Sequence, residues 1–126
     1  MKIIKLDHLV LTVKDIKKTV SFYTTVLGMQ KEVFGKDRIA LKYGNQKINL
    51  HLCDGDIQPK AMAPTPGSAD LCFVTEDPLH SAIKQIQSCG IEIIEGPVER
   101  TGARGKIQSV YCRDPDGNLI EIATEL

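Results

Sequence analysis

The stretch that decides the fold is residues 7–15, DHLVLTVKD, which returns at residues 69–77 as ADLCFVTED. Each copy has the alternating apolar positions of a strand and ends in acidic residues typical of a turn. A second landmark repeats as well, because LGM at residues 27–29 returns as CGI at residues 89–91. His8 and Asp70, like Gly28 and Gly90, are 62 positions apart. One offset for two unlike landmarks predicts two copies of one structural module.

Each module is predicted to carry one amphipathic helix after its first strand. Apolar residues recur there at spacings of three or four, and a glycine stops each helix. We expect Asp15 to cap the first helix and Asp77 the second, with Pro78 at the first helical position. The apolar positions are Ile16, Val20, Tyr23 and Leu27 in the first copy, and Leu79, Ile83, Ile86 and Cys89 in the second.

Three further strand-like runs follow each helix, and together they define the fold class. These runs are residues 29–34, 38–43 and 46–53, then 91–98, 107–113 and 118–124. We therefore predict one α+β domain, residues 1–126, made of two βαβββ modules at about 1–53 and 68–126, with a linker at 54–67. One module alone exposes an open apolar edge, so the two are expected to pair into a curved, partly open barrel of mixed β-sheet with a ligand cleft.

Composition and charge exclude several classes of function. The chain has 16 basic and 16 acidic residues, 42% hydrophobic residues and no long apolar run, so neither a nucleic acid nor a membrane is an expected partner. The N-terminus lacks the apolar core of a signal peptide, and we expect a cytoplasmic protein. The cysteines at positions 53, 72, 89 and 112 form no CxxC pair and are expected to be reduced residues packed in apolar runs.

Three side chains on three different strands form a candidate metal site. His8 lies in the first strand, His51 in the fourth and Glu121 in the last, where a carboxylate stands in an otherwise apolar segment. Two imidazoles and a carboxylate suit one divalent ion such as Zn, Ni, Mn or Fe, with positions left for substrate. A lone histidine in a strand is more often an ordinary core or surface residue than a ligand, and Glu121 could pair with a lysine.

Other polar residues are candidates for supporting roles. Asp70 stands where the second module repeats His8, and we interpret it first as a partner that orients a ligand, then as a fourth ligand or a cap for the linker. Residues 100–105 read as a basic, glycine-rich loop between two strands. Through Arg100 and Thr101 this loop could bind an anionic substrate, although an ordinary solvated loop is equally consistent. The DPDG turn at residues 114–117 is interpreted as structural.

A family resemblance is carried by DHLVLTV at residues 7–13, by Phe22-Tyr23 and Leu27-Gly28, and by DPDGNLIE at residues 114–121. These motifs resemble the vicinal oxygen chelate superfamily, which includes glyoxalase I, bleomycin resistance proteins and dioxygenases. More narrowly, QKINLH at 46–51, PTPGSADLCF at 64–73 and GPVERTGA at 96–103 resemble the glyoxalase domain-containing protein 5 group. Bacterial members of that group are often labelled virulence proteins.

The resemblance implies metal-ligand roles for His8 and Glu121. In the fourth strand glyoxalase I has a glutamate, whereas this chain offers Asn49 and, two residues on, His51. We favour His51, with Asn49 as the alternative, because imidazole binds metals better than an amide does. The chain departs from the family at Asp70, where glyoxalase I and the thiol transferases that inactivate fosfomycin have a histidine.

The preferred hypothesis is a metal-dependent lyase or isomerase that resembles glyoxalase I, the lactoylglutathione lyase, and acts on a small oxygen-chelating substrate. Glu121 or a metal-bound water would move the proton. The alternatives are a thiol transferase or dioxygenase on the same fold, or a metal-free small-molecule-binding resistance protein, which Asp70 slightly favours. The resemblance also implies a homodimer, whose modules could pair within one chain or between two.

Overall fold

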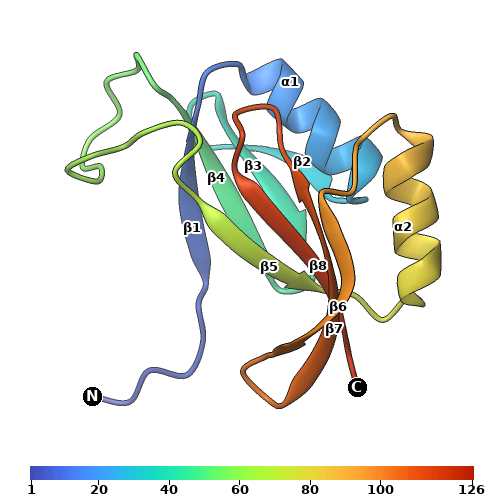
Figure 1. The fold of residues 1–126 in the computed structure, drawn as a ribbon. Coiled ribbons are helices and arrows are strands. Elements are labelled where there is room, and N and C mark those ends of the chain that lie inside the picture. The colour runs from blue at the N-terminus through green and yellow to red at the C-terminus, as the bar shows by residue number, and fades with distance from the viewer. The chain divides into compact units, whose positions relative to one another are not determined.

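The computed structural model describes residues 1–126 and divides them into two units, Met1–Pro66 and Gly67–Leu126. Both units have the same βαβββ order, so the predicted pair of α+β modules is confirmed (Figure 1). The first unit contains β1 (His8–Val13), α1 (Ile16–Ser21), the π-helical turn η1 (Phe22–Val26), β2 (Gln30–Phe34), β3 (Arg38–Tyr43) and β4 (Gln46–Leu52). The second contains β5 (Asp70–Val74), α2 (Leu79–Ser88), β6 (Glu95–Thr101), β7 (Lys106–Arg113) and β8 (Leu119–Glu125).

In the first unit the strands form one open mixed sheet in the order β1-β4-β3-β2. β1 runs parallel to β4, and the other neighbours are antiparallel. Asp15 caps α1 as predicted, because its carboxylate accepts the Lys18 N–H at 2.9 Å. α1 packs on β4 and covers one face of the sheet (Figure 1), where Val13, Leu41 and Ile48 are fully buried. The opposite face carries His8, Asn49 and the other polar strand residues.

In the second unit the order is β5-β8-β7-β6, again with the first and last strands parallel. α2 packs on β7 and β8, where Val110, Cys112 and Ile120 are fully buried. The opposite face carries Glu121 and Tyr111, which lie opposite each other in the paired strands. In each unit, therefore, one sheet face is the core and the other presents the candidate functional residues.

Three local predictions need correction. The predicted cap at Asp77 is wrong, because α2 begins one residue later than expected and Pro78 is its N-cap, with a carbonyl that accepts the Ser81 N–H at 2.9 Å. The second strand of the second module, β6, begins at Glu95 rather than at residue 91. A bulge follows Glu95, and a Cβ on Gly96 would lie 2.5 Å from a backbone oxygen there. β6 also ends later than predicted, at Thr101 rather than at residue 98.

The prediction that the cysteines are packing residues holds fully for Cys112 alone. All four thiols are free, but Cys53 and Cys72 are exposed and Cys89 is half-buried. Cys72 belongs to the polar face of β5, which strand alternation places opposite the core. No helix in the structure is long and apolar enough to cross a membrane.

The DPDG turn is structural, as predicted, and it fixes β8 in place. The Asp114 carboxylate accepts N–H groups from Asp116 and Asn118, and its other oxygen accepts the Asn118 side-chain amide at 2.8 Å. The Asn118 side-chain oxygen accepts the Ala69 N–H at 2.8 Å, immediately before β5. This buried network ties the start of β5 to the start of β8 and so sets the register of the strand that carries Glu121.

Candidate functional site

His8 begins β1 with its side chain 44% exposed and its ring already oriented. Its Nδ1 lies 2.8 Å from Asp7 Oδ1. Because a carboxylate can only accept, Nδ1 donates, and the Nε2 lone pair is left available to bind a metal. This hydrogen bond is the main cause that lowers the pKa of Asp7. His8 thus has the partner that metal-ligating histidines have in known sites.

The pairing of β1 with β4 decides which polar residues lie near His8. His8 is opposite Lys47, Val10 is opposite Asn49, and Thr12 is opposite His51. Four residues of register separate the two histidines, a distance of about 13 Å along the strands, whereas Asn49 is half as far from His8. The structure therefore does not bring His8 and His51 together.

Asn49 lies on the same sheet face as His8 and is only 5% exposed. Its side-chain oxygen Oδ1 is buried and has no hydrogen-bond partner. A buried amide oxygen without a partner is unfavourable unless a ligand, ion or water meets it. Asn49 is thus the second candidate donor of the first unit.

His51 is engaged elsewhere. Its Nε2 accepts a hydrogen bond from Arg38 Nη2 at 3.1 Å, because a guanidinium can only donate. Burial lowers the pKa of His51, and the charges of Arg38 and Lys60 lower it further. The imidazole is accordingly neutral, and its Nε2 lone pair is already used in the hydrogen bond from Arg38.

Glu121 occupies the middle of β8, flanked in register by Cys72 on β5 and Tyr111 on β7. Its Oε1 atom is buried without a hydrogen-bond partner. Burial raises the pKa of the Cys72 thiol to about 11, and the charges of Glu121 and Asp70 add to that effect. Cys72 is therefore a neutral thiol beside the carboxylate at physiological pH.

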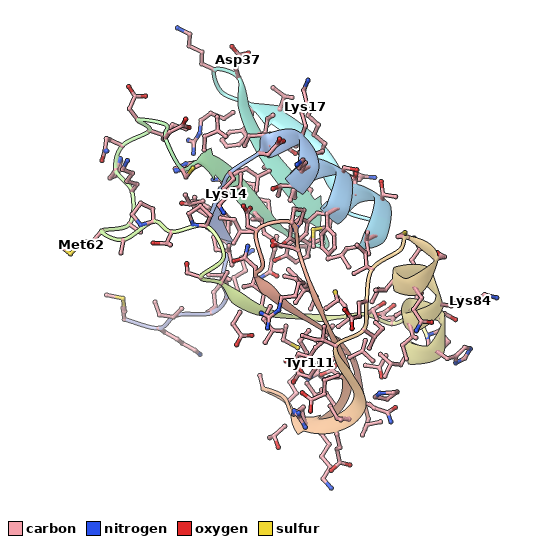
Figure 2. The ribbon with its side chains drawn as sticks, turned by 45° about the horizontal axis from the view of Figure 1, so that its top comes forward. Lys14, Lys17, Asp37, Met62, Lys84 and Tyr111 are labelled. Atoms are coloured by element: carbon pink, nitrogen blue, oxygen red, sulfur yellow. The ribbon has the colours of Figure 1, made fainter.

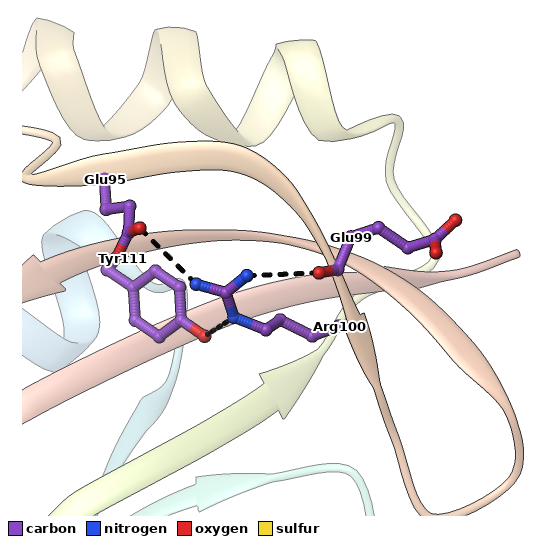
Figure 3. A network of polar contacts seen from close by, with 4 residues as sticks. All are labelled: Glu95, Glu99, Arg100 and Tyr111. Atoms are coloured by element: carbon purple, nitrogen blue, oxygen red, sulfur yellow. Dashed lines mark hydrogen bonds and ion pairs between the residues drawn. The ribbon is translucent and has the colours of Figure 1, made fainter.

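Arg100 and Tyr111 extend this row of side chains across the sheet (Figure 3). Arg100 Nε donates to the Tyr111 hydroxyl at 3.1 Å, and its other nitrogens reach Glu95 Oε1 at 3.4 Å and the Glu99 carbonyl at 3.1 Å. Desolvation raises the pKa of Tyr111, the Arg100 hydrogen bond opposes this, and Glu121 raises it again. The Tyr111 hydroxyl is thus protonated and held between a cation and a carboxylate.

The predicted location of Arg100 and Thr101 in a loop needs correction, because both belong to β6 and only residues 102–105 connect it to β7. Both residues nevertheless line a hollow of about 520 Å³ together with Cys72, Tyr111 and Glu121. Strand placement fixes the Arg100 backbone more firmly than a loop would.

Asp70 begins β5, as His8 begins β1, and its side chain is exposed. It lines a second hollow of about 400 Å³, which it shares with Arg100, Tyr111 and Glu121. Asp70 and Glu121 therefore lie on one face of the same sheet, and Asp70 belongs to the site whichever role it has.

Sequence reasoning left Tyr111 unassigned and missed Cys72 as a site residue. A signal for Tyr111 was present, because the tight turn at residues 114–117 joins β7 and β8 as a hairpin. A hairpin around that turn pairs Arg113 with Leu119 and so Tyr111 with Glu121, as the structure shows. Cys72 carried no comparable signal, because the parallel pairing of β5 with β8 is not local in the sequence.

The polar face of each unit offers donors of the kinds that divalent ions bind. They are an imidazole nitrogen with an oriented ring, a carboxylate oxygen without a partner and an amide oxygen without a partner, on His8, Glu121 and Asn49. Nitrogen and oxygen donors of this kind suit first-row divalent metals. Neither unit by itself contains a cluster of three or more His, Cys, Asp or Glu side chains that could hold an ion.

The fold and these side chains define a class of protein. It has two βαβββ modules, and the polar faces of its sheets carry side chains of the types that bind metals. The polar face of the second sheet also borders two hollows. The chain belongs to the Glyoxalase/Bleomycin resistance protein/Dioxygenase superfamily, whose family model matches residues 5–122. The resemblance seen in the motifs of the sequence is thereby confirmed.

Three relatives illustrate its range. The chain is 57% identical over 123 residues to "Virulence protein STM3117" of Salmonella typhimurium, covering 98% of this chain and 85% of that protein. It is 56% identical to the integron cassette protein VCH_CASS1 of V. cholerae, whose structure matches with a TM-score of 0.99 over 100% of this chain and 98% of that one. It is 28% identical over 120 residues to the metallothiol transferase FosB of Shouchella clausii, covering 94% of this chain and 79% of that protein.

Proposed function

We propose that this protein is a metal-dependent lyase or isomerase of glyoxalase I type that acts on a small oxygen-chelating substrate. The observation that carries the proposal is Glu121, whose Oε1 is buried without a partner in an otherwise apolar strand. A carboxylate oxygen in that state costs free energy unless a cation or a substrate group meets it. The metal is one divalent ion, Zn, Ni, Mn or Fe, and the working form is a homodimer.

His8 and Glu121 are the principal ligands in this proposal, and Asn49 takes the fourth-strand place in preference to His51. The register supports that choice. Asn49 pairs with the residue two positions after His8, and Glu121 pairs with the residue two positions after Asp70. Asn49 is thus the counterpart of Glu121 in the duplicated fold, and His51 is not.

A divalent ion in this site would supply the positive charge that polarises a substrate carbonyl. Glu121 would take the proton from the hydroxyl-bearing carbon beside that carbonyl and return it to the former carbonyl carbon, while the hydroxyl proton moves to the carbonyl oxygen. The reaction is then an isomerisation without net proton loss. Tyr111, held by Arg100, would position the Glu121 carboxylate. Arg100 and Thr101 would bind an anionic part of the substrate, because they line the hollow that contains Glu121.

The test is a divalent-metal titration with elemental analysis of the full-length protein. We expect about one ion per chain in the wild type, lost in His8→Ala and in Glu121→Ala and retained in His51→Ala. Asp7→Ala should lower metal affinity about tenfold to hundredfold, because it removes the acceptor that orients His8. A sample with bound metal then enters an activity screen against hemithioacetals, thiol conjugates and catechols.

Two exposed residues supply matched controls, His80→Ala on α2 and Glu92→Ala, and both should bind metal like the wild type. Urea unfolding midpoints separate loss of a ligand from loss of the fold. If His51→Ala loses the ion as completely as His8→Ala, the assignment of Asn49 fails. If the folded wild type binds no divalent ion at saturation, the enzyme proposal fails and a metal-free small-molecule-binding protein takes its place.

A further inference from the structure

One cavity lies in the first unit, at the end of β4 that is far from His8. It has a volume of about 200 Å³ and is enclosed by the ends of β3 and β4 and by the segment that follows β4. Figure 1 shows this segment leaving β4 as a long loop, and Figure 2 shows Met62 of the loop pointing outward. The lining of the cavity includes residues of the segment 53–64 and shares no residue with the hollows around Glu121.

Two cations border this cavity, Arg38 at the start of β3 and Lys60 in the covering loop. Neither forms an ion pair within residues 1–126. Lys60 has only a long hydrogen bond of 3.4 Å to a backbone carbonyl. Asp37 and Asp56 also border the cavity, yet no carboxylate oxygen lies within 4.0 Å of either cation.

The Arg38 guanidinium is held in a fixed position with part of its hydrogen-bonding capacity unused. Its Nη2 donates to His51 Nε2 at 3.1 Å, and its central carbon lies 4.8 Å from the centre of the Phe34 ring. Its Nε atom is buried and has no hydrogen-bond partner. A buried, charged donor without an acceptor is costly, and its usual acceptor is an oxyanion that matches the guanidinium fork.

We propose that this cavity is a binding site for a small-molecule oxyanion, a carboxylate or a phosphate group, with Arg38 and Lys60 as its cationic ligands. The Arg38 guanidinium would donate to one oxygen and Lys60 Nζ to another. The cavity holds a few water volumes, which suits one such group rather than a whole cofactor. His51 acts as the positioning residue, because its Nε2 accepts a hydrogen bond from the guanidinium.

The proposal does not depend on the proposed metal chemistry, because no residue of this cavity is among the proposed metal ligands. It also gives His51 a role, that of holding Arg38, although His51 is not a proposed metal ligand. His51 and Asn49 share one face of the first unit's sheet. A substrate with an anionic tail is therefore one source of the oxyanion, and a separate small anion is the other.

The test is a titration of the full-length protein with inorganic phosphate and, separately, with acetate at constant ionic strength. The readout is the NMR signal of the Arg38 Nε–H, which reports this cavity alone. We expect a saturable shift of that signal. Saturation by phosphate only would identify a phosphoryl group, and saturation by acetate as well would identify a carboxylate.

Variants decide whether the effect is specific. Lys60→Gln should weaken binding about tenfold, because it removes one charge-assisted contact. Arg38→Gln should weaken binding at least as much, and it is followed by the NMR signals of the His51 ring, which also lines the cavity. Lys84→Gln is the matched control, because Lys84 projects into solvent from α2 (Figure 2). If Arg38→Gln does not fold, exposed Lys60 still tests the site. A shift that never saturates, or equal weakening by Lys60→Gln and Lys84→Gln, would overturn the proposal.

Discussion

Replacing Asn118 by alanine should destabilise the protein by about 4 kcal/mol, because its side chain joins two strands from a buried position. Its exposed fraction is 1%, so water cannot take over its hydrogen bonds. The amide donates to Asp114 Oδ2 at 2.8 Å and accepts the Ala69 N–H at 2.8 Å. Alanine leaves the Ala69 N–H without its acceptor and removes one charge-assisted hydrogen bond from the Asp114 carboxylate. These losses cost about 1–3 kcal/mol each, the charged one at the upper end.

The assay is urea unfolding of the full chain, followed by far-ultraviolet circular dichroism, with the loss taken from the midpoint and the m-value. Asn45→Ala is the matched control in the exposed turn between β3 and β4, and it should change the free energy of unfolding by less than about 0.5 kcal/mol. Hydrogen exchange of the Ala69 amide should also accelerate in the Asn118 variant. A loss below about 1 kcal/mol, with unchanged exchange at Ala69, would refute the reasoning that this network holds β5 to β8.

Two further predictions concern backbone strain and alkaline pH. Gly67 and Gly90 have similar positive φ values, +83° and +76°, but only at Gly67 would a Cβ meet a backbone oxygen, that of Asp116 at 2.6 Å. Gly67→Ala should therefore cost about 2 kcal/mol more than Gly90→Ala in urea unfolding, and equal losses would contradict the clash. Burial, and then the charge of Asp114, raise the pKa of the Cys112 thiol to about 11 from an ordinary value near 9. As pH rises, the thiol of the unfolded chain loses its proton before that of the folded chain. The free energy of unfolding of the wild type should therefore fall by about 1 kcal/mol between pH 8 and 10 relative to Cys112→Ala. A pH-independent difference between the two proteins would contradict the raised pKa.

The fold was largely predictable because its signals are local. Alternating apolar residues marked β3 with its observed bounds, and the repeated landmarks identified the duplication. β6 was displaced by four residues because residues 91–94 are apolar enough to resemble a strand but precede the bulge at Glu95. The start of α2, observed at Leu79, was predicted one residue too early. A proline next to a capping residue leaves two adjacent positions for the helix N-terminus, and the sequence does not choose between them.

The candidate site was less predictable, because strand alternation assigns a residue to a face but not to a place along it. Asn49 and His51 have the same parity and therefore share a face, so the sequence favoured the stronger ligand type. Their distances from His8 depend on how β1 pairs with β4, two strands that are more than thirty residues apart in the chain. The hairpin that pairs Tyr111 with Glu121 is local, by contrast, and its turn gives the register directly.

The duplication also explains why the donors differ between the units. The first-strand place holds His8 in one unit and Asp70 in the other, and the last-strand place holds Asn49 and Glu121. The copies of a duplicated module begin identical, so these differences arose as the two units diverged. Each unit now has one donor of a type that binds first-row metals well, an imidazole or a buried carboxylate, and His51 lies outside both equivalent places. If His8, Asn49 and Glu121 hold the ion as proposed, the ligand set has one nitrogen and is harder than two imidazoles and a carboxylate, and it favours Mn or Fe over Zn.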